Sequence, residues 1–277
     1  MTAARRWNAR RWKDRAAAAV IGLGAAATLV PVLLVLGYVV REGLQALDVA
    51  FFTRLPAPVG EPGGGVLNAI VGTLLIDLAA ALMGVVVGVG AGVFLSEFRE
   101  HPASGLVRLV NDVMAGVPAI IVGLVAYELV VRPMGHFSGL AGSVALGLIM
   151  VPIVTRATES VLRLVPRELR EAGLALGLPR WRVVVSVVLP TARYGVTTGV
   201  LLALARVSGE AAPLLFTAFG NPFLNVNLLQ PMDSLPLRLF TYAISPYPEW
   251  HRLAWGCALV LVALILVTTA AARRATG

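Results

Sequence analysis

Six long apolar stretches alternate with shorter polar connections along the chain. The apolar stretches cover residues 17–40, 66–95, 109–131, 139–155, 194–218 and 251–270. A helix of about 20 apolar residues crosses the hydrocarbon core of a bilayer, because all its backbone polar groups are satisfied internally. The pattern therefore predicts an all-α integral membrane protein with six transmembrane helices.

The first apolar stretch follows a basic tail. Arg10-Arg11 ahead of an apolar run that contains Ala25-Ala26-Ala27 would also suit a cleaved export signal. The run itself, residues 17–40, is longer than the core of about 7–15 residues that signal peptides have. We therefore expect a cytoplasmic tail over residues 1–16 and a retained first transmembrane helix over residues 17–40.

Basic residues are distributed unevenly between the polar connections. Charged residues make up 14% of the chain, whereas soluble domains contain about 25%. In a six-span arrangement, 17 of the 23 basic residues fall on the side of the N-terminus and 5 on the other side. Because Lys and Arg collect in cytoplasmic connections, both termini are expected in the cytoplasm. The net charge of +8 thus indicates topology and not nucleic-acid binding.

Residues with metal-binding, redox or nucleotide-binding chemistry are scarce. Cys257 is the only cysteine, which excludes an internal disulfide and a cysteine-based metal cluster. His101, His136 and His251 lie in three different connections, without the spacing of a metal site. Lys13 is the only lysine and lies near the N-terminus, so the chain has no P-loop for ATP hydrolysis. We expect no cofactor and no enzymatic activity.

The longest polar segment runs from Arg156 to Arg193 and contains a predicted short helix. Pro166 suits the start of a helix, Gly177 suits its C-cap, and Pro179 prevents its continuation. Between them lies a narrow apolar stripe at helical spacing: Leu169, Ala172, Gly173 and Leu176. Because small residues allow close approach, we expect this cytoplasmic helix to dock on a partner. The alternative is an amphipathic helix that lies on the membrane.

Charged residues interrupt two of the apolar stretches. A central Arg costs at least about 2.5–3.5 kcal/mol in lipid, so Arg206 is expected to face the interior of the bundle. Glu210 follows four residues later, close enough on a helix to pair with Arg206. The residues alone leave a structural ion pair and a role in a substrate path equally open. Asp77 is a weaker candidate for such a path and better suits a hydrogen bond between helices.

Other positions predict how the helices pack and end. A face of small residues for close helix packing is predicted by Gly84, Gly88 and Gly92. Pro118 predicts a kink in the third span, and Asn111 and Asp112 are expected to serve the start of that span. Ser234 and Pro236 predict a short external helix that ends near residue 244.

The segment from Arg156 to Arg193 also resembles the EAA loop of ABC-importer permeases. Glu171-Ala172-Gly173 is followed by Gly177 and then by Val187-Val188-Leu189-Pro190, in the spacing of that motif. Gly173 stands where the motif has a second Ala, which keeps the residue small but lowers helix propensity by about 1 kcal/mol. The match at several separated points makes the resemblance specific.

Further segments resemble the permease subunits of phosphate ABC transporters. LARVSGEAAPLLFTAFGNPF, residues 204–223, is similar to their R-A-x-G-E-T-A-P-L-L-F-T run. PMDSLPLRLF, residues 231–240, is closer to the A-type subunit than to the C-type subunit. The sequence departs from the family pattern at Ala119, Val207, Ser208 and Ala211. The resemblance implies the type I ABC-importer permease fold for a core over residues 63–272, with the EAA loop at about 156–193.

The resemblance also implies partners, a substrate and site residues. It implies a multi-pass subunit of the bacterial cytoplasmic (inner) membrane that translocates inorganic phosphate and pairs with a C-type permease subunit. Two copies of an ABC ATPase would lie below, and a periplasmic or extracellular phosphate-binding protein above. ATPase coupling is implied for Glu171, Ala172, Gly173, Gly177, Leu189 and Pro190. Arg206 falls where the family has a transport-essential arginine, with Glu210 as its acidic neighbour.

Two other functions are compatible with the sequence. The chain could be a permease for another oxyanion, such as molybdate, sulfate or phosphonate. It could also be a membrane anchor or assembly protein without transport activity. Arg206 and Glu210 disfavour the anchor, because a passive anchor gains nothing from charge inside the membrane.

Overall fold

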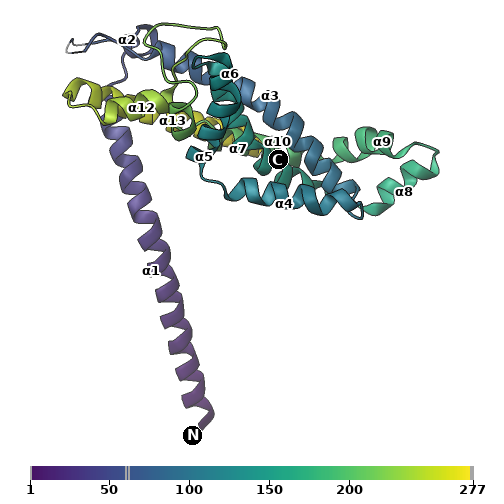
Figure 1. The fold of residues 1–277 in the computed structure, drawn as a ribbon. Coiled ribbons are helices and arrows are strands. Elements are labelled where there is room, and N and C mark those ends of the chain that lie inside the picture. Colours follow the sequence, from purple (N-terminus) through teal and green to yellow (C-terminus); the bar gives the residue numbers. More distant parts are fainter. Residues whose placement is uncertain (1, 60, 62, 275–277) are drawn as a thin grey trace.

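The structure, a computed structural model, describes residues 2–59, 61 and 63–274, with side chains from Trp12 onward. The basic side chains at positions 5, 6, 10 and 11, which contribute to the predicted orientation, lie outside the described ones. Five long helices dominate the fold (Figure 1): α1 (Thr2–Leu44), α3 (Leu67–Glu97), α7 (Gly139–Leu162), α10 (Leu189–Val207) and α13 (Pro248–Arg274).

Shorter helices connect the long ones. In the N-terminal half of the chain these are α2 (Val49–Thr53), α4 (Pro102–Gly116), α5 (Ala119–Ala126), the π-helical η1 (Tyr127–Val131) and α6 (Arg132–Met134). The remainder are α8 (Arg167–Ala175), α9 (Arg180–Val183), the π-helical η2 (Val184–Val188), α11 (Ala212–Leu215) and α12 (Leu235–Ala243). The described part of the chain contains no β-strand, only an isolated bridge between Phe219 and Met232. The expected all-α membrane fold is confirmed.

Five helices are long and apolar enough to cross a membrane. These five are α3, α7, α13, the continuous helical segment 180–207, and the part of α1 that covers residues 12–44. A sixth crossing requires α4 and the helical segment 119–134 to act together, although they meet at an angle of 108°. The expected six spans are therefore five straight crossings and one broken one.

The break in the third span is sharper than the kink predicted at Pro118. α4 ends at Gly116, and Val117 and Pro118 both have extended backbones before α5 begins. Proline disfavours helical geometry in the residue before it, and it cannot donate a helical hydrogen bond. The predicted kink at Pro118 is thus present as a sharp corner, which divides the span expected over residues 109–131 at this dipeptide.

The fifth span is also shifted from its predicted position. A single helical segment begins at Arg180, passes through η2 into α10 and ends at Val207, whereas residues 194–218 were predicted. The polar residues 180–193 are therefore the cytoplasmic end of the span and not a loop. Ser234 caps α12 by accepting a hydrogen bond from the backbone N–H of Leu237, as predicted.

The core of the bundle is the pair α3 and α7, which run in the same direction: Gly84, Gly88 and Gly92 face Met150, Val154 and Thr158 in turn. A Cβ atom added to Gly84, Gly88 or Gly92 would lie within 3.0 Å of a side-chain atom of Met150, Val154 or Thr158, respectively. The predicted glycine face therefore packs directly against side chains of α7, because α3 contributes no side chain of its own at these three positions. Ile76, Ala80 and Leu146 extend this buried cluster towards the outer side.

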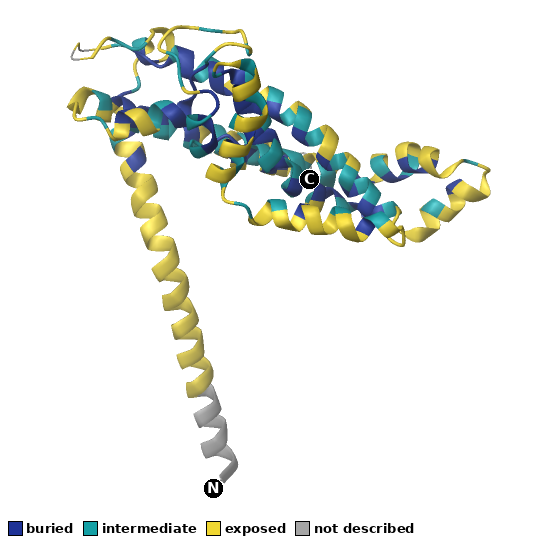
Figure 2. Ribbon diagram, in the orientation of Figure 1, coloured by how far each residue is buried: buried dark blue, intermediate teal, exposed yellow. Residues whose placement is uncertain are grey.

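α1 extends away from this bundle (Figure 1). Its side chains are exposed along nearly the whole described length, as Figure 2 shows, and they are apolar between Arg15 and Arg41. Only the last turns touch the bundle: Tyr38 stacks edge-on against Trp255, and Gly43 packs against Leu259. A helix that is apolar on all sides and exposed in this way is typical of a span surrounded by lipid.

Candidate functional site: a charged cavity and a cytoplasmic coupling helix

Arg206 and Glu210 line the same cavity, which has a volume of about 270 Å³. Arg206 lies in the last turn of α10, and Glu210 lies in the turn that follows. α4, α5 and α7 complete the wall with Met114, Ala115, Val117, Ala119, Ile149, Pro152, Ile153 and Arg156. Val117, in the corner between α4 and α5, is part of this wall. The two charged residues are therefore brought together around an otherwise mostly apolar chamber.

The expected i, i+4 pair between Arg206 and Glu210 is not among the ion pairs that join the described residues. α10 ends at Val207, so Glu210 is no longer on the helix that carries Arg206. On this chain Arg206 is exposed and Glu210 is partly exposed. Both residues line the cavity, and none of the ion pairs between described residues involves the Arg206 guanidinium.

Asp77 occupies a different place. It lies on α3 and is 8% exposed, and the side chain of Ser208, at the end of α10, lies near it. Asp77 does not line the cavity of Arg206 and Glu210. Its position supports the interpretation as a contact between helices, and the structure does not bring it together with the other two pathway candidates.

The predicted docking helix is α8. Pro166, predicted as its first residue, is instead its N-cap, and the helix begins at Arg167. Gly177 follows its C-terminal end in the left-handed conformation, with φ +80°. Glu171 and Ala172 are exposed on its surface, and Leu176 is 82% exposed. Pro190 is exposed in the first turn of α10, and Leu189 is half-buried beside it.

Gly173 does not share the exposed face. It is buried, and a Cβ atom there would lie 3.0 Å from Cγ2 of Val183 in α9. The expectation that Gly173 belongs to the docking stripe was therefore wrong in this respect, because the helix turns this residue towards its own hairpin. Its role is to let α8 pack closely against α9.

Arg170 ties α8 to the membrane bundle, a contact that sequence analysis missed. Its guanidinium binds the carboxylate of Glu97 at the end of α3, with Nη2 2.8 Å from Oε1. It also donates to the carbonyl oxygens of Leu162, at 2.9 Å, and of Val165, at 2.6 Å. One side chain thus joins the docking helix to the cytoplasmic ends of both α3 and α7.

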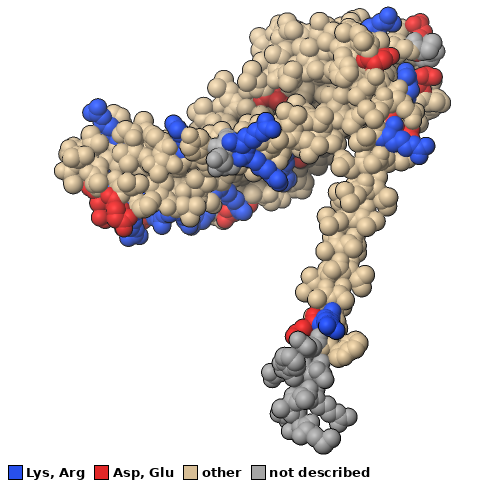
Figure 3. All heavy atoms as spheres, turned by 180° about the vertical axis from the view of Figure 1, so that it is seen from behind, with Lys and Arg blue, Asp and Glu red and all other residues tan. Residues whose placement is uncertain are grey.

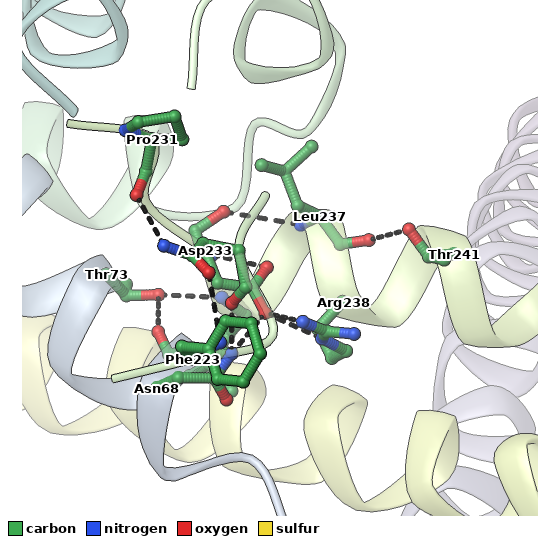
Figure 4. A network of polar contacts seen from close by, with 12 residues as sticks. Asn68, Thr73, Phe223, Pro231, Asp233, Leu237, Arg238 and Thr241 are labelled. Carbon is green, nitrogen blue, oxygen red and sulfur yellow. Dashed lines mark hydrogen bonds and ion pairs between the residues drawn. The ribbon is translucent and has the colours of Figure 1, made fainter. Parts of the chain in front are cut away.

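A second buried network lies at the opposite end of α3 (Figure 4). Asp233 accepts hydrogen bonds from Arg238 Nε at 2.6 Å and from Asn68 Nδ2 at 2.9 Å. The Oγ1 of Thr73 accepts a hydrogen bond from the backbone N–H of Leu235 at 2.7 Å. Burial raises the pKa of Asp233, and the guanidinium of Arg238 opposes that shift. These contacts fix α12 and the preceding external connection to α3.

A family model described as "Binding-protein-dependent transport system inner membrane component" matches residues 84–275. The phosphate transport system permease protein PstA of Yersinia pestis is 43% identical, over 84% of this chain and 80% of that protein. A probable phosphate transport system permease protein PstA of Methanocaldococcus jannaschii is 35% identical, over 92% of this chain and 90% of that protein.

Solved structures show the same fold. A chain of the MetNI methionine ABC transporter in an inward-facing conformation superposes with a TM-score of 0.64 and 19% identity, over 76% of this chain and 94% of that one. At this identity the likeness concerns the fold alone. Together with the long apolar helices, the family match identifies the chain as a multi-pass component of the inner membrane. The chain belongs to the family of binding-protein-dependent transport system inner-membrane components.

Proposed function

We propose that this chain is a permease subunit of an ABC importer that carries inorganic phosphate across the cytoplasmic membrane. The observation that carries the proposal is the cavity shared by Arg206 and Glu210, in a chain whose relatives are named phosphate permeases. A guanidinium presents a planar fork of donors that matches phosphate oxygens. Arg206 is the residue that contacts the passing anion, and Glu210 lines the same chamber.

The chain works with other subunits and hydrolyses no ATP itself. Coupling to a separate ATPase, of which two copies are needed, is assigned to the exposed surface of α8 at Glu171, Ala172 and Gly177. Leu189 and Pro190 set the start of α10 beside it, and Gly173 holds the hairpin together from inside. A C-type permease subunit completes the pathway, and an external phosphate-binding protein delivers the substrate.

A second candidate is import of another oxyanion. The shape of a guanidinium does not separate phosphate from sulfate, molybdate or phosphonate, so that choice rests on the external binding protein. The names of the relatives favour phosphate. A passive membrane anchor is disfavoured because it has no use for a cavity with two charged residues.

The test is phosphate uptake by cells that lack the chromosomal subunit and carry this chain or a variant. We expect the wild-type chain to restore uptake, Arg206→Lys to retain only weak uptake because it loses the fork, and Arg206→Met to retain none. Co-purification with the ATPase is the control for assembly. Uptake of sulfate or molybdate without phosphate would select the second candidate.

Arg206→Met combined with Glu210→Gln separates a substrate contact from a structural counter-ion. If Arg206 only neutralises Glu210, removal of both charges restores transport, since no charge is then left unpaired. We expect the double variant to assemble and to remain inactive. Recovery of uptake in the double variant would contradict the role of Arg206 as the anion contact.

A further inference from the structure

Three cavities follow one another along α7, and neighbouring cavities share an arginine. The chamber of Arg206 and Glu210 also has Arg156 in its wall. A second cavity of about 250 Å³ is lined by Arg156, Arg163 and Arg108. A third, of about 690 Å³, is lined by Arg163 and lies between α8, α9 and the end of α3. Arg156 therefore belongs to the first two cavities, and Arg163 to the second and third.

The residues of α7 in the first two walls form one helical stripe. They are Ile149, Pro152, Ile153, Arg156, Glu159, Ser160 and Arg163, the C-cap of the helix, at intervals of one, three and four residues. At a rise of 1.5 Å per residue, the stripe is about 21 Å long, most of the thickness of a hydrocarbon core of about 30 Å. It leads from the chamber of Arg206 to the cytoplasmic end of the bundle.

The arginines of this stripe form ion pairs with carboxylates of the same chain. Arg156 Nη2 of α7 lies 2.8 Å from Oδ1 of Asp112 in α4. Asp112 lies inside α4 and pairs with the neighbouring helix, so it does not serve the start of a helix as expected. Glu159 binds Arg108, at 2.7 Å, and also Arg163. The side chains of Arg156 and Asp112 are 57% and 51% exposed, and such an exposed ion pair contributes little free energy. Glu159 is only 13% exposed, but it divides its carboxylate between Arg108 and Arg163.

A phosphate oxyanion presents the same kind of acceptor to a guanidinium as a carboxylate does. It can therefore take the place of Asp112 at Arg156, and then the place of Glu159 at Arg163. Glu159 keeps Arg108 as a partner during the second exchange, so its carboxylate is not left unpaired. Because a carboxylate competes for each arginine, the anion is not trapped on the way, which conduction through successive sites requires.

We propose that this stripe is the cytoplasmic half of the anion path, with Arg156 and Arg163 as successive transient binding sites for phosphate below Arg206. The inference rests on the proposed function. The anion leaves through the third cavity, whose wall also contains Arg99, Arg167 and Arg180. Basic side chains gather at this end of the molecule, on the left in Figure 3, where α8 and α9 lie.

The first test compares matched arginine variants in the complete transporter, reconstituted in vesicles. We expect Arg156→Gln to lower the maximal rate of phosphate uptake at least tenfold. The control is Arg132→Gln, because Arg132 also forms an exposed ion pair, with Glu128, but lies away from all three cavities. The control should stay within twofold of wild type. Equal effects of the two variants would overturn the inference.

Asp112 distinguishes an anion site from a structural ion pair. If Arg156 serves only to pair with Asp112, then Asp112→Asn is as harmful as Arg156→Gln, and the double variant recovers. If Arg156 binds the anion, Asp112→Asn only removes a competitor, so we expect uptake within threefold of wild type. We expect the double variant to be as slow as Arg156→Gln alone. The first pattern would refute the role of Arg156.

A second measurement, thiol labelling at position 160, tests for an anion path without measuring transport. Ser160 is exposed in the second cavity, so Ser160→Cys can be labelled from the cytoplasmic side with anionic or cationic thiol reagents. The complex without this change is the blank, since Cys257 is buried. We expect the anionic reagent to react faster, inorganic phosphate to slow it, and Arg156→Gln to remove the preference. Absence of any preference would refute an anion path.

The two measurements separate this inference from the function on which it rests. If the wild-type transporter imports no phosphate but the anionic preference at position 160 persists, the substrate is another oxyanion and the path stands. If the wild type imports phosphate and neither Arg156→Gln nor the labelling differs from its control, the function stands and the path is wrong.

Discussion

Arg170 of α8 and Glu97 of α3 are joined by a two-pronged ion pair, in which Nη2 lies 2.8 Å and Nε 3.2 Å from Oε1. Both side chains are largely buried, with 19% and 13% exposure. The pair connects the helix that we assign to ATPase coupling with the end of a transmembrane helix. The ion pair is therefore a direct side-chain contact between α8 and the end of α3.

Loss of Arg170 should harm coupling more than loss of Glu97. Arg170→Ala removes the ion pair and also leaves the carbonyl oxygens of Leu162 and Val165 without their donor, whereas Glu97→Gln keeps those bonds. We expect Arg170→Ala to reduce phosphate-stimulated ATP hydrolysis about tenfold and Glu97→Gln about threefold, with both complexes assembled. The measurement is ATP hydrolysis by the purified transporter. Equal losses would show that the carbonyl contacts are unimportant.

Gly173 and Val183 should compensate for each other. Val183→Ala removes two buried methyl groups and is expected to destabilise the transporter by about 1–2 kcal/mol. Gly173→Ala in that background fills part of the space, and Ala also favours the helix by about 1 kcal/mol. We expect the double variant to recover most of the loss in thermal midpoint. No recovery would mean that the two residues do not form the contact between α8 and α9.

Gly177 offers a way to separate backbone strain from docking. Its φ of +80° disfavours Ala by about 1–2 kcal/mol, whereas Asn tolerates this conformation better. No atom of this chain lies within 4 Å of a Cβ at this position, so Asn should leave the stability nearly unchanged. We expect Gly177→Asn to fold normally and yet reduce ATPase co-purification. Normal coupling in that variant would place the ATPase contact elsewhere on α8.

The external network should depend on Arg238. Arg238→Met leaves the carboxylate of Asp233 buried without its counter-charge, which is expected to cost about 3–5 kcal/mol and to raise the pKa of Asp233 further. The thermal midpoint of the purified transporter is the measurement, and Arg132→Met, in an exposed pair, is the control. We expect Asp233→Leu combined with Arg238→Met to recover part of the stability. A loss as small as that of the control would show that the pair is not effectively buried.

Sequence patterns predicted the helices well where one physical signal dominated. Long apolar runs specified the spans of α3, α7 and α13, and the glycines at every fourth position specified the contact between α3 and α7. Gly177 and Ser234 also took their predicted cap roles, because the backbone requirements at helix ends are local. Arg206 and Glu210 were found because charge is rare in apolar sequence.

The remaining features depend on contacts between distant residues. The kink at Pro118 could be predicted, but its 108° angle depends on how α5 packs against α7 and α11. Arg170 and Glu97 are 73 positions apart, and each is an ordinary surface residue in its own segment. Arg156 and Asp112 likewise become informative only once α4 lies along α7. Gly173 fits the exposed stripe by spacing alone, and only the fold of the hairpin turns it inward.

α3 carries the coupling contact at one end and the external network at the other. Glu97 binds Arg170 at the cytoplasmic side, while a Cβ on Gly72 would lie 2.0 Å from the backbone oxygen of Asp233 near the outer side. The helix between Asn68 and Glu97 is unbroken and about 44 Å long. Close packing of its glycines against α7 stiffens it further. We therefore expect a change in the tilt of α3 to shift Glu97 and the external network together, because no break in the helix separates them.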